Sequence, residues 1–160
     1  MRTMKCGMTW LNGKHAILLF WKYVQCWRGS MQKILKFVEK SSLVKDFKVH
    51  DFKTGKEFAY IKLEILFKDS SKVHIREFVS STQRKYSFHW IVDTRIEMRW
   101  DNSPHHKSIT TYPHHVHVNQ DVYPSECSDP VKILRWIESL LISKEELTPE
   151  IILHEIRKLR

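Results

Sequence analysis

The sequence predicts an α+β fold, in which an antiparallel β-meander of about four to six strands carries an N-terminal helix and C-terminal helices packed on one face. Three observations predict it. Apolar residues recur at helical spacing in 31-MQKILKFVEKS-41, and the apolar period then changes to two as far as residue 101. Near the end of the chain, Asp129-Pro130 and Thr148-Pro149 each place a capping side chain before a proline, which is typical of a helix start.

Alternating apolar side chains indicate the strands of the meander. Phe47 and Val49 suggest a first strand. Four further strands are expected at residues 57–67, 72–79, 84–92 and 95–101. The connections between them are short and polar, and connections this short permit only antiparallel neighbours.

Beyond residue 101 the pattern changes. Residues 102–130 are rich in proline, histidine and serine, and they include one plausible short strand at 115–118. Two helices are expected to close the chain, at 131–141 and 151–159.

Matching the apolar faces of neighbouring strands predicts how they pair, because a slip of one residue would expose the whole apolar set. The register that keeps one face apolar pairs Ile65 with Ile75, Ile75 with Trp90, and Trp90 with Met98. The opposite face then carries one polar row, formed by Glu64, Arg76, His89 and Arg99. Such a row is either a solvated ladder of cross-strand pairs or a cationic strip, with a titratable His89, that could hold a phosphate.

Glu77 differs from its neighbours because it shares a strand face with Val73, Ile75 and Val79. A carboxylate among apolar neighbours must pair, reach the edge of the sheet or take a raised pKa. In the last case Glu77 would be a candidate general acid.

The first thirty residues differ in composition from the rest. The chain has a formal net charge of +9, and residues 1–30 contribute five basic residues and no acidic one, together with three of the six tryptophans. We interpret residues 1–30 as a basic, Trp-rich extension upstream of the true start at Met31, with an interfacial helix as the alternative. A domain at 31–143 and a C-terminal helical extension at 144–160 follow.

Several classes of protein are disfavoured by the sequence. The apolar run 16-AILLFW-21 is too short to span a bilayer, so no transmembrane segment is expected. Three cysteines without CxxC spacing indicate neither a disulfide framework nor a cysteine zinc site, and they fit the cytoplasm. The sequence has no P-loop, GxGxxG or GxSxG motif, so nucleotide cofactors and a serine nucleophile have no support.

Half of the ten histidines lie in the thirteen residues from His105 to His117, within two Pro-His-His blocks. Histidine is the commonest metal ligand, and side chains two residues apart on a strand project to the same side. A divalent metal bound by His106, His115 and His117 is therefore one interpretation of the cluster.

Two other interpretations need no metal. Neutral and protonated histidines could act as base and acid on a ribose 2'-hydroxyl, while Arg76 or Arg99 stabilises the charge that develops on phosphorus. Alternatively, the imidazoles could satisfy loop carbonyls in turns fixed by Pro104 and Pro113.

Four blocks of the sequence resemble the TumE family, the toxin half of a toxin-antitoxin pair: 74-HIREFV-79, 86-YSFHW-90, 99-RWDNSPHH-106 and 112-YPHHVHV-118. The resemblance runs from about Met31 to Leu141 and is most specific in the two histidine-rich blocks. It implies a small cytoplasmic protein encoded beside a DNA-binding antitoxin that neutralises it. One departure is Val116, where related sequences often have a basic residue.

Together these features predict a toxin that acts on RNA as a metal-independent His/Arg endoribonuclease without a cofactor. The catalytic candidates are His89, Arg99, Arg76, His115 and Glu77. The candidates for substrate binding are Arg76, Trp100, Asn102, His105, His106 and Tyr112. The alternatives are a non-catalytic protein- or RNA-binding module neutralised by its antitoxin, and a hydrolase that depends on a divalent metal bound by the histidines.

Overall fold

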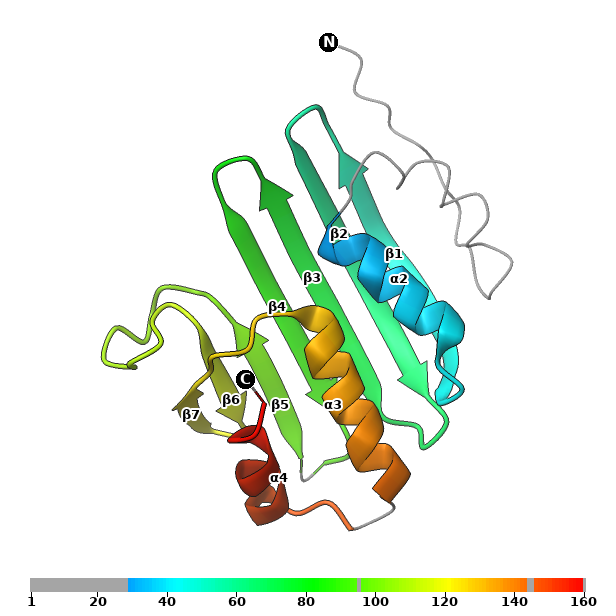
Figure 1. Ribbon diagram of the computed structural model, residues 1–160, viewed down its shortest axis with the longest axis vertical. Helices are drawn as coiled ribbons and strands as arrows, with labels where there is room; N and C mark the ends of the chain where they lie inside the picture. Colours follow the sequence, from blue (N-terminus) through cyan, green and yellow to red (C-terminus); the bar gives the residue numbers. More distant parts are fainter. Residues whose placement is uncertain (1–28, 95, 144–145, 160) are drawn as a thin grey trace.

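The computed structural model describes residues 29–94, 96–143 and 146–159, so the extension expected at residues 1–30 lies almost entirely outside the described residues. Within these ranges, α2 and α3 cross one face of a seven-stranded antiparallel sheet (Figure 1). The elements are α2 (Ser30–Lys40), β1 (Val44–Thr54), β2 (Phe58–Phe67), β3 (Lys72–Ser80), β4 (Arg84–Ile91), β5 (Glu97–Asp101), β6 (His115–Val118), β7 (Asp121–Pro124), α3 (Pro130–Ser143) and α4 (Pro149–Ile156).

The predicted α+β meander is confirmed. The described strands neighbour one another in chain order from β1 to β7, and every pair is antiparallel. Seven described strands exceed the four to six expected, because the four-residue β7 pairs with β6. Its sequence, DVYP, is too short to show an alternating pattern and ends in proline, so only its pairing with β6 makes it a strand.

The helix-covered face of the sheet contains the apolar core. Burial alternates along β2, where Ile61 and Leu63 are at most 1% exposed. Trp136 of α3 meets Trp90 and Trp100 edge-on, with ring centroids 6.1 and 5.7 Å away. Aromatic pairs of this geometry contribute about 0.5–1.5 kcal/mol beyond the area they bury. The three tryptophans therefore hold α3 on β4 and β5.

Both predicted helix starts near the C-terminus are confirmed. Asp129 Oδ1 accepts a hydrogen bond from the Val131 amide at 2.8 Å, and Thr148 Oγ1 accepts one from the Ile151 amide at 3.4 Å. Helix α4 places Ile152 in the core at 0% exposed, so this helix packs on the domain. Among the described residues, no helix has the length and apolar character needed to cross a membrane.

The predicted register is confirmed between β4 and β5, where Trp90 pairs with Met98 and His89 with Arg99. It is wrong by two residues in the two preceding strand pairs. There the observed partners are Ile65 with Val73 and Val73 with Trp90, not Ile75. A slip of two residues leaves every side chain on its own face, so the apolar pattern cannot detect it. The tight turns decide the register instead, as at β3 to β4, where the Ser80 amide donates to the Gln83 carbonyl at 2.8 Å.

Glu77 lies on the helix-covered face and is fully buried. Its Oε1 accepts a hydrogen bond from Arg84 Nε at 2.8 Å, and its Oε2 accepts one from Ser30 Oγ at 2.5 Å. Of the three outcomes expected for this carboxylate, the structure shows pairing. The sheet separates Glu77 from the catalytic candidates on the opposite face.

Candidate functional site

The face of the sheet opposite α2 and α3, called here the open face, carries two adjacent rows of polar side chains. The first row crosses five strands and consists of Glu64, His74, His89, Arg99 and His117. The second consists of Lys62, Arg76, Ser87, Asp101 and His115. His89 and Arg99 are neighbours as expected. Arg76 belongs to the second row, which corrects the single row predicted, because the register of β3 differs by two residues.

A hollow of about 530 Å³ lies on the open face over β2, β3 and β4, and we call it the open-face groove. Its charged lining consists of the cations Lys62, Arg76 and Arg99 and the carboxylate of Glu64. Three histidines also line it: His50, His74 and His89. Three cations against one carboxylate leave two excess positive charges even when the imidazoles are neutral. The groove therefore suits an anionic ligand such as a phosphate backbone.

His89 stands at the β5 side of this groove with its side chain 26% exposed. Its Nε2 is 2.7 Å from Oε1 of Glu97, at an angle outside that of a hydrogen bond. The Glu97 carboxylate is 57% exposed and His89 Nε2 is buried beside it, so a ligand in the groove would reach Nε2 only after Glu97 turns away.

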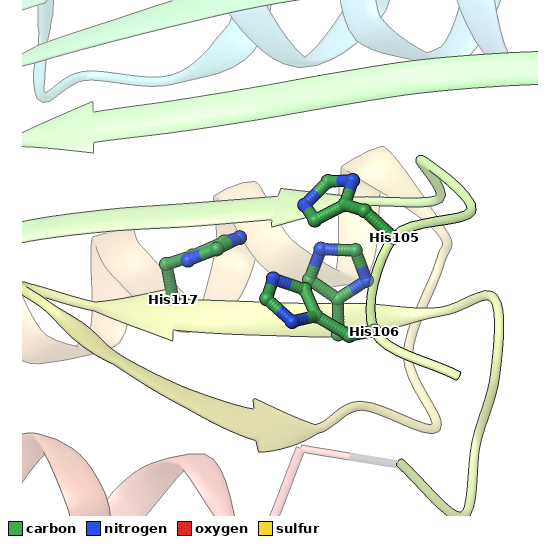
Figure 2. Close-up of side chains that lie close together, drawn as sticks. His105, His106 and His117 are labelled. Carbon is green, nitrogen blue, oxygen red and sulfur yellow. The ribbon is translucent and has the colours of Figure 1, made fainter. Parts of the chain in front are cut away.

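Four imidazoles converge where β6 meets the loop of residues 102–114. His105 and His106 come from the loop, and His115 and His117 come from β6. Figure 2 shows His105, His106 and His117 gathered beside β6. One ring nitrogen from each of the four lies within 4.8 Å of those from the others. We call these four residues the histidine cluster.

Asp101 lies beside the cluster and is 3% exposed. Its Oδ1 accepts a hydrogen bond from the Ser103 amide at 2.9 Å, and its Oδ2 accepts one from Arg99 Nε at 3.0 Å. The same carboxylate is 3.1 Å from His115 Nε2 and 3.7 Å from His117 Nε2. Burial alone would raise the pKa of Asp101, but the Ser103 hydrogen bonds and the charges of His115 and Arg99 outweigh burial and lower that pKa. Asp101 is therefore a fixed negative charge in the second row, in contact with Arg99 and His117 of the first row.

Two of the cluster imidazoles, His106 and His117, have lowered pKa values. Burial, followed by the charge of Arg99, lowers the pKa of His117 to about 4. Burial and the neighbouring His105 and His115 lower the pKa of His106. An Arg99 terminal nitrogen is 3.1 Å from His117 Nε2, and because a guanidinium only donates, that imidazole nitrogen accepts.

A family model described as Toxin TumE matches residues 34–147, which include the sheet and the histidine cluster. The chain belongs to the TumE toxin family. Comparisons with curated proteins and with solved structures found no match. Membership in a toxin family implies a neutralising antitoxin as partner.

Several candidate residues of this TumE-family chain do not lie at the cluster or groove. Trp100 is fully buried against Trp136 on the helix-covered face, which removes it from any substrate on the open face. Asn102 connects the loop to β4, since its side chain donates to the Arg84 carbonyl at 2.8 Å and accepts from the Tyr86 amide at 2.9 Å. Tyr112 is 44% exposed, near the end of the same loop and three residues before β6.

The departure from the TumE family pattern at Val116 also lies away from the open face. Val116 is 0% exposed in β6 and pairs with Trp100 of β5, within the apolar core. A basic side chain here would have to leave the core to contact a phosphate.

Sequence reasoning missed His74 and Lys62, which the structure places in the groove. Both follow from the correct register of β2 and β3, in which Lys62 pairs with Arg76 and Glu64 with His74. The length of the turn between these strands was the signal that could have found them, because turn geometry fixes hairpin register.

Proposed function

We propose that this TumE-family toxin cleaves RNA, with the RNA backbone bound along the open-face groove and the scissile phosphate beside His89 and Arg99. The observation that carries the proposal is the unbroken polar row from the groove to the cluster, in which His89 pairs with Arg99 and Arg99 with His117. Cationic side chains on a sheet face and a hydrogen-bonding imidazole beside them are what phosphodiester chemistry needs.

Arg99 is the residue we assign to charge stabilisation. Its side chain is 41% exposed, while the buried Asp101 fixes the Nε side of its guanidinium at 3.0 Å. A guanidinium held by one edge presents the remaining N–H groups in a defined direction, which suits two oxygens of a phosphate. Arg76 and Lys62 supply further phosphate contacts along the groove.

His89 is the residue we assign to proton transfer, because it is partly exposed at the groove. His115, the other acid-base candidate, is 1% exposed, and its Nδ1 bonds the Pro113 carbonyl at 2.9 Å. Its burial keeps His115 from direct contact with a substrate. The acid-base pair of a metal-independent mechanism is therefore incomplete here, and a second candidate function, metal-assisted hydrolysis, gains support from the four converging imidazoles.

We further propose the cytoplasm as the site of action and a DNA-binding protein as the antitoxin, as the family resemblance implies. A protein that cleaves RNA meets its substrate in that compartment, and an antitoxin that covered the open-face groove would compete with RNA for the same cations.

The test is tightly induced expression of the full chain in a bacterial host, with growth and total RNA followed in the same culture. Growth arrest with cleaved RNA is expected for the wild-type chain. His89→Gln and Arg99→Gln should each lower cleavage of a labelled RNA by about 10²- to 10⁴-fold, since this is the usual contribution of acid-base and charge-stabilising groups. Lys33→Gln is the charge-matched control, because Lys33 is exposed on α2 at the other side of the sheet.

Measurements of RNA binding distinguish the residues that hold the RNA in the groove from those that take part in cleavage. Removing the charge of Lys62 or Arg76 should weaken RNA binding and reduce the salt dependence of the binding constant by about one ion per substitution. Growth arrest that leaves RNA intact, or RNA cleavage that survives in both the His89 and Arg99 variants, would refute the proposed function.

A further inference from the structure

The buried imidazole of His115 has a ring nitrogen that no hydrogen bond satisfies. Its Nδ1 lies 2.9 Å from the Pro113 carbonyl oxygen, which can only accept, so Nδ1 carries a hydrogen. In the neutral ring, Nε2 then presents a lone pair. This atom faces Asp101 Oδ1 at 3.1 Å and makes no hydrogen bond there. A lone pair and a carboxylate repel at this distance unless a cation lies against both.

Three further imidazoles surround this lone pair. The ring centroids of His105, His106 and His117 are 5.0, 4.8 and 5.0 Å from that of His115. Nε2 of His106 is buried and also lacks a hydrogen-bond partner. A proton can be shared by two of these nitrogens, whereas a metal ion can be bound by all four. The convergence of four imidazoles therefore favours a metal ion as the cation.

We propose that the histidine cluster binds a transition-metal dication of the Zn²⁺ class through His105, His106, His115 and His117. Imidazole nitrogens suit Zn²⁺, Ni²⁺ and Cu²⁺, whereas Mg²⁺ and Ca²⁺ prefer oxygen ligands. In a tetrahedral zinc site the ligand nitrogens lie ~3.3 Å apart, as follows from Zn–N bonds of ~2.0–2.1 Å. The four nitrogens, already within 4.8 Å of one another, reach that spacing by small rotations of the rings.

The surroundings of the cluster match those of a metal centre. A metal-bound histidine usually donates its other ring N–H to a carbonyl or carboxylate, and His115 does so to Pro113. Asp101 adds a buried negative charge beside the ion, and the Ser103 amide orients that carboxylate at 2.9 Å.

The position of the cluster gives the ion a role in the proposed cleavage of RNA, and this part of the inference rests on that function. His117 pairs with Arg99, so the ion lies next to the row that carries the scissile phosphate. With four imidazole ligands a tetrahedral ion would have no open position for a phosphate oxygen, so its role would be to hold the loop histidines His105 and His106 against β6, beside Arg99.

Metal binding is tested on the purified full chain, first treated with a chelator, by calorimetric titration with Zn²⁺ and by the absorption spectrum of the Co²⁺ form. We expect one Zn²⁺ per chain and a Co²⁺ spectrum of tetrahedral nitrogen coordination. His106→Gln should lower the Zn²⁺ affinity at least tenfold, and Asp101→Asn should lower it by about 10- to 100-fold, as removal of outer-shell partners does. His154→Gln, on an imidazole that is 71% exposed on α4, should leave the affinity unchanged.

Folding of each variant is checked by its unfolding midpoint, because His115 is buried and His115→Gln alone could fail to fold. His106→Gln and His105→Gln involve less buried side chains and keep the test valid. Zn²⁺ affinity that is the same in wild type, His106→Gln and His105→Gln would overturn the proposed site.

The two proposals fail in different ways. Stoichiometric Zn²⁺ binding without RNA cleavage, in metal-loaded protein, leaves the metal site standing and refutes the ribonuclease. If the chelator-treated protein cleaves RNA and takes up no Zn²⁺ in the calorimetric titration, the ribonuclease is supported and the metal site is refuted.

Discussion

Replacing Arg84 by methionine should destabilise the protein by about 3 kcal/mol, because it leaves the Glu77 carboxylate buried without its cation. Glu77 is 0% exposed, and Arg84 Nε donates to it at 2.8 Å. Removal of one partner from a buried ion pair costs about 3–5 kcal/mol, and the lower value applies here because the Arg84 side chain is 31% exposed. Urea unfolding followed by the fluorescence of the core tryptophans measures the change.

A double-mutant cycle with Glu77→Gln isolates the charge pair from the other contacts of Arg84. In the Glu77→Gln background, Arg84→Met should cost only about 1 kcal/mol, the value of its hydrogen bond to the Ser128 carbonyl at 2.8 Å. The expected coupling free energy is thus about 2 kcal/mol. An equal cost of Arg84→Met in both backgrounds would show that Arg84 acts through Ser128 and the Tyr86 ring, and that the pair with Glu77 contributes nothing.

Two further predictions concern the core and the groove. Trp136→Ala should lower the free energy of unfolding by about 3–5 kcal/mol, because it removes the edge-on contacts with Trp90 and Trp100; a loss under about 1 kcal/mol would contradict this packing. Burial lowers the pKa of His74 from 6.5, and the attraction of Glu64 offsets this only in part, so an NMR titration should give a lower pKa in the folded chain than in the unfolded chain. The unfolded state then binds more protons than the folded state. The contribution of His74 to the free energy of unfolding is therefore complete above pH ~6.5 and decreases as the pH falls below that value. In urea unfolding at several pH values, His74→Gln should show a smaller decrease than the wild type.

The histidine cluster shows how far sequence reasoning could reach toward the site. Two Pro-His-His blocks indicated that these histidines act together, and β6 placed His115 and His117 on one strand. Their convergence with His105 and His106 depends on the path of the loop at 102–114, which is fixed by long-range contacts such as the Tyr86 hydroxyl to His114 Nδ1 at 2.8 Å. Contacts of this kind leave no periodic trace in the sequence.

Burial explains why some candidates lie elsewhere. Trp100 and Glu77 belong to the same conspicuous sequence blocks as Arg99 and Arg76, yet the period of two along a strand places alternate residues on opposite faces. Neighbours in the sequence therefore divide between the core and the open face, and a block of residues indicates a site without saying which of its members form it.

The sequence by itself determined the fold class, the helix starts at Asp129 and Thr148, the face on which the residues of β2 to β5 lie, and the pairing of His89 with Arg99. All of these follow from local signals, namely the apolar period and the chemistry of caps and short turns. Only the tertiary structure decided the register of β2, β3 and β4, the burial of His115 and the meeting of four imidazoles. A slip of two residues preserves every local signal. The free-energy difference between the observed register and the slipped one therefore arises from turn geometry and from packing between distant residues.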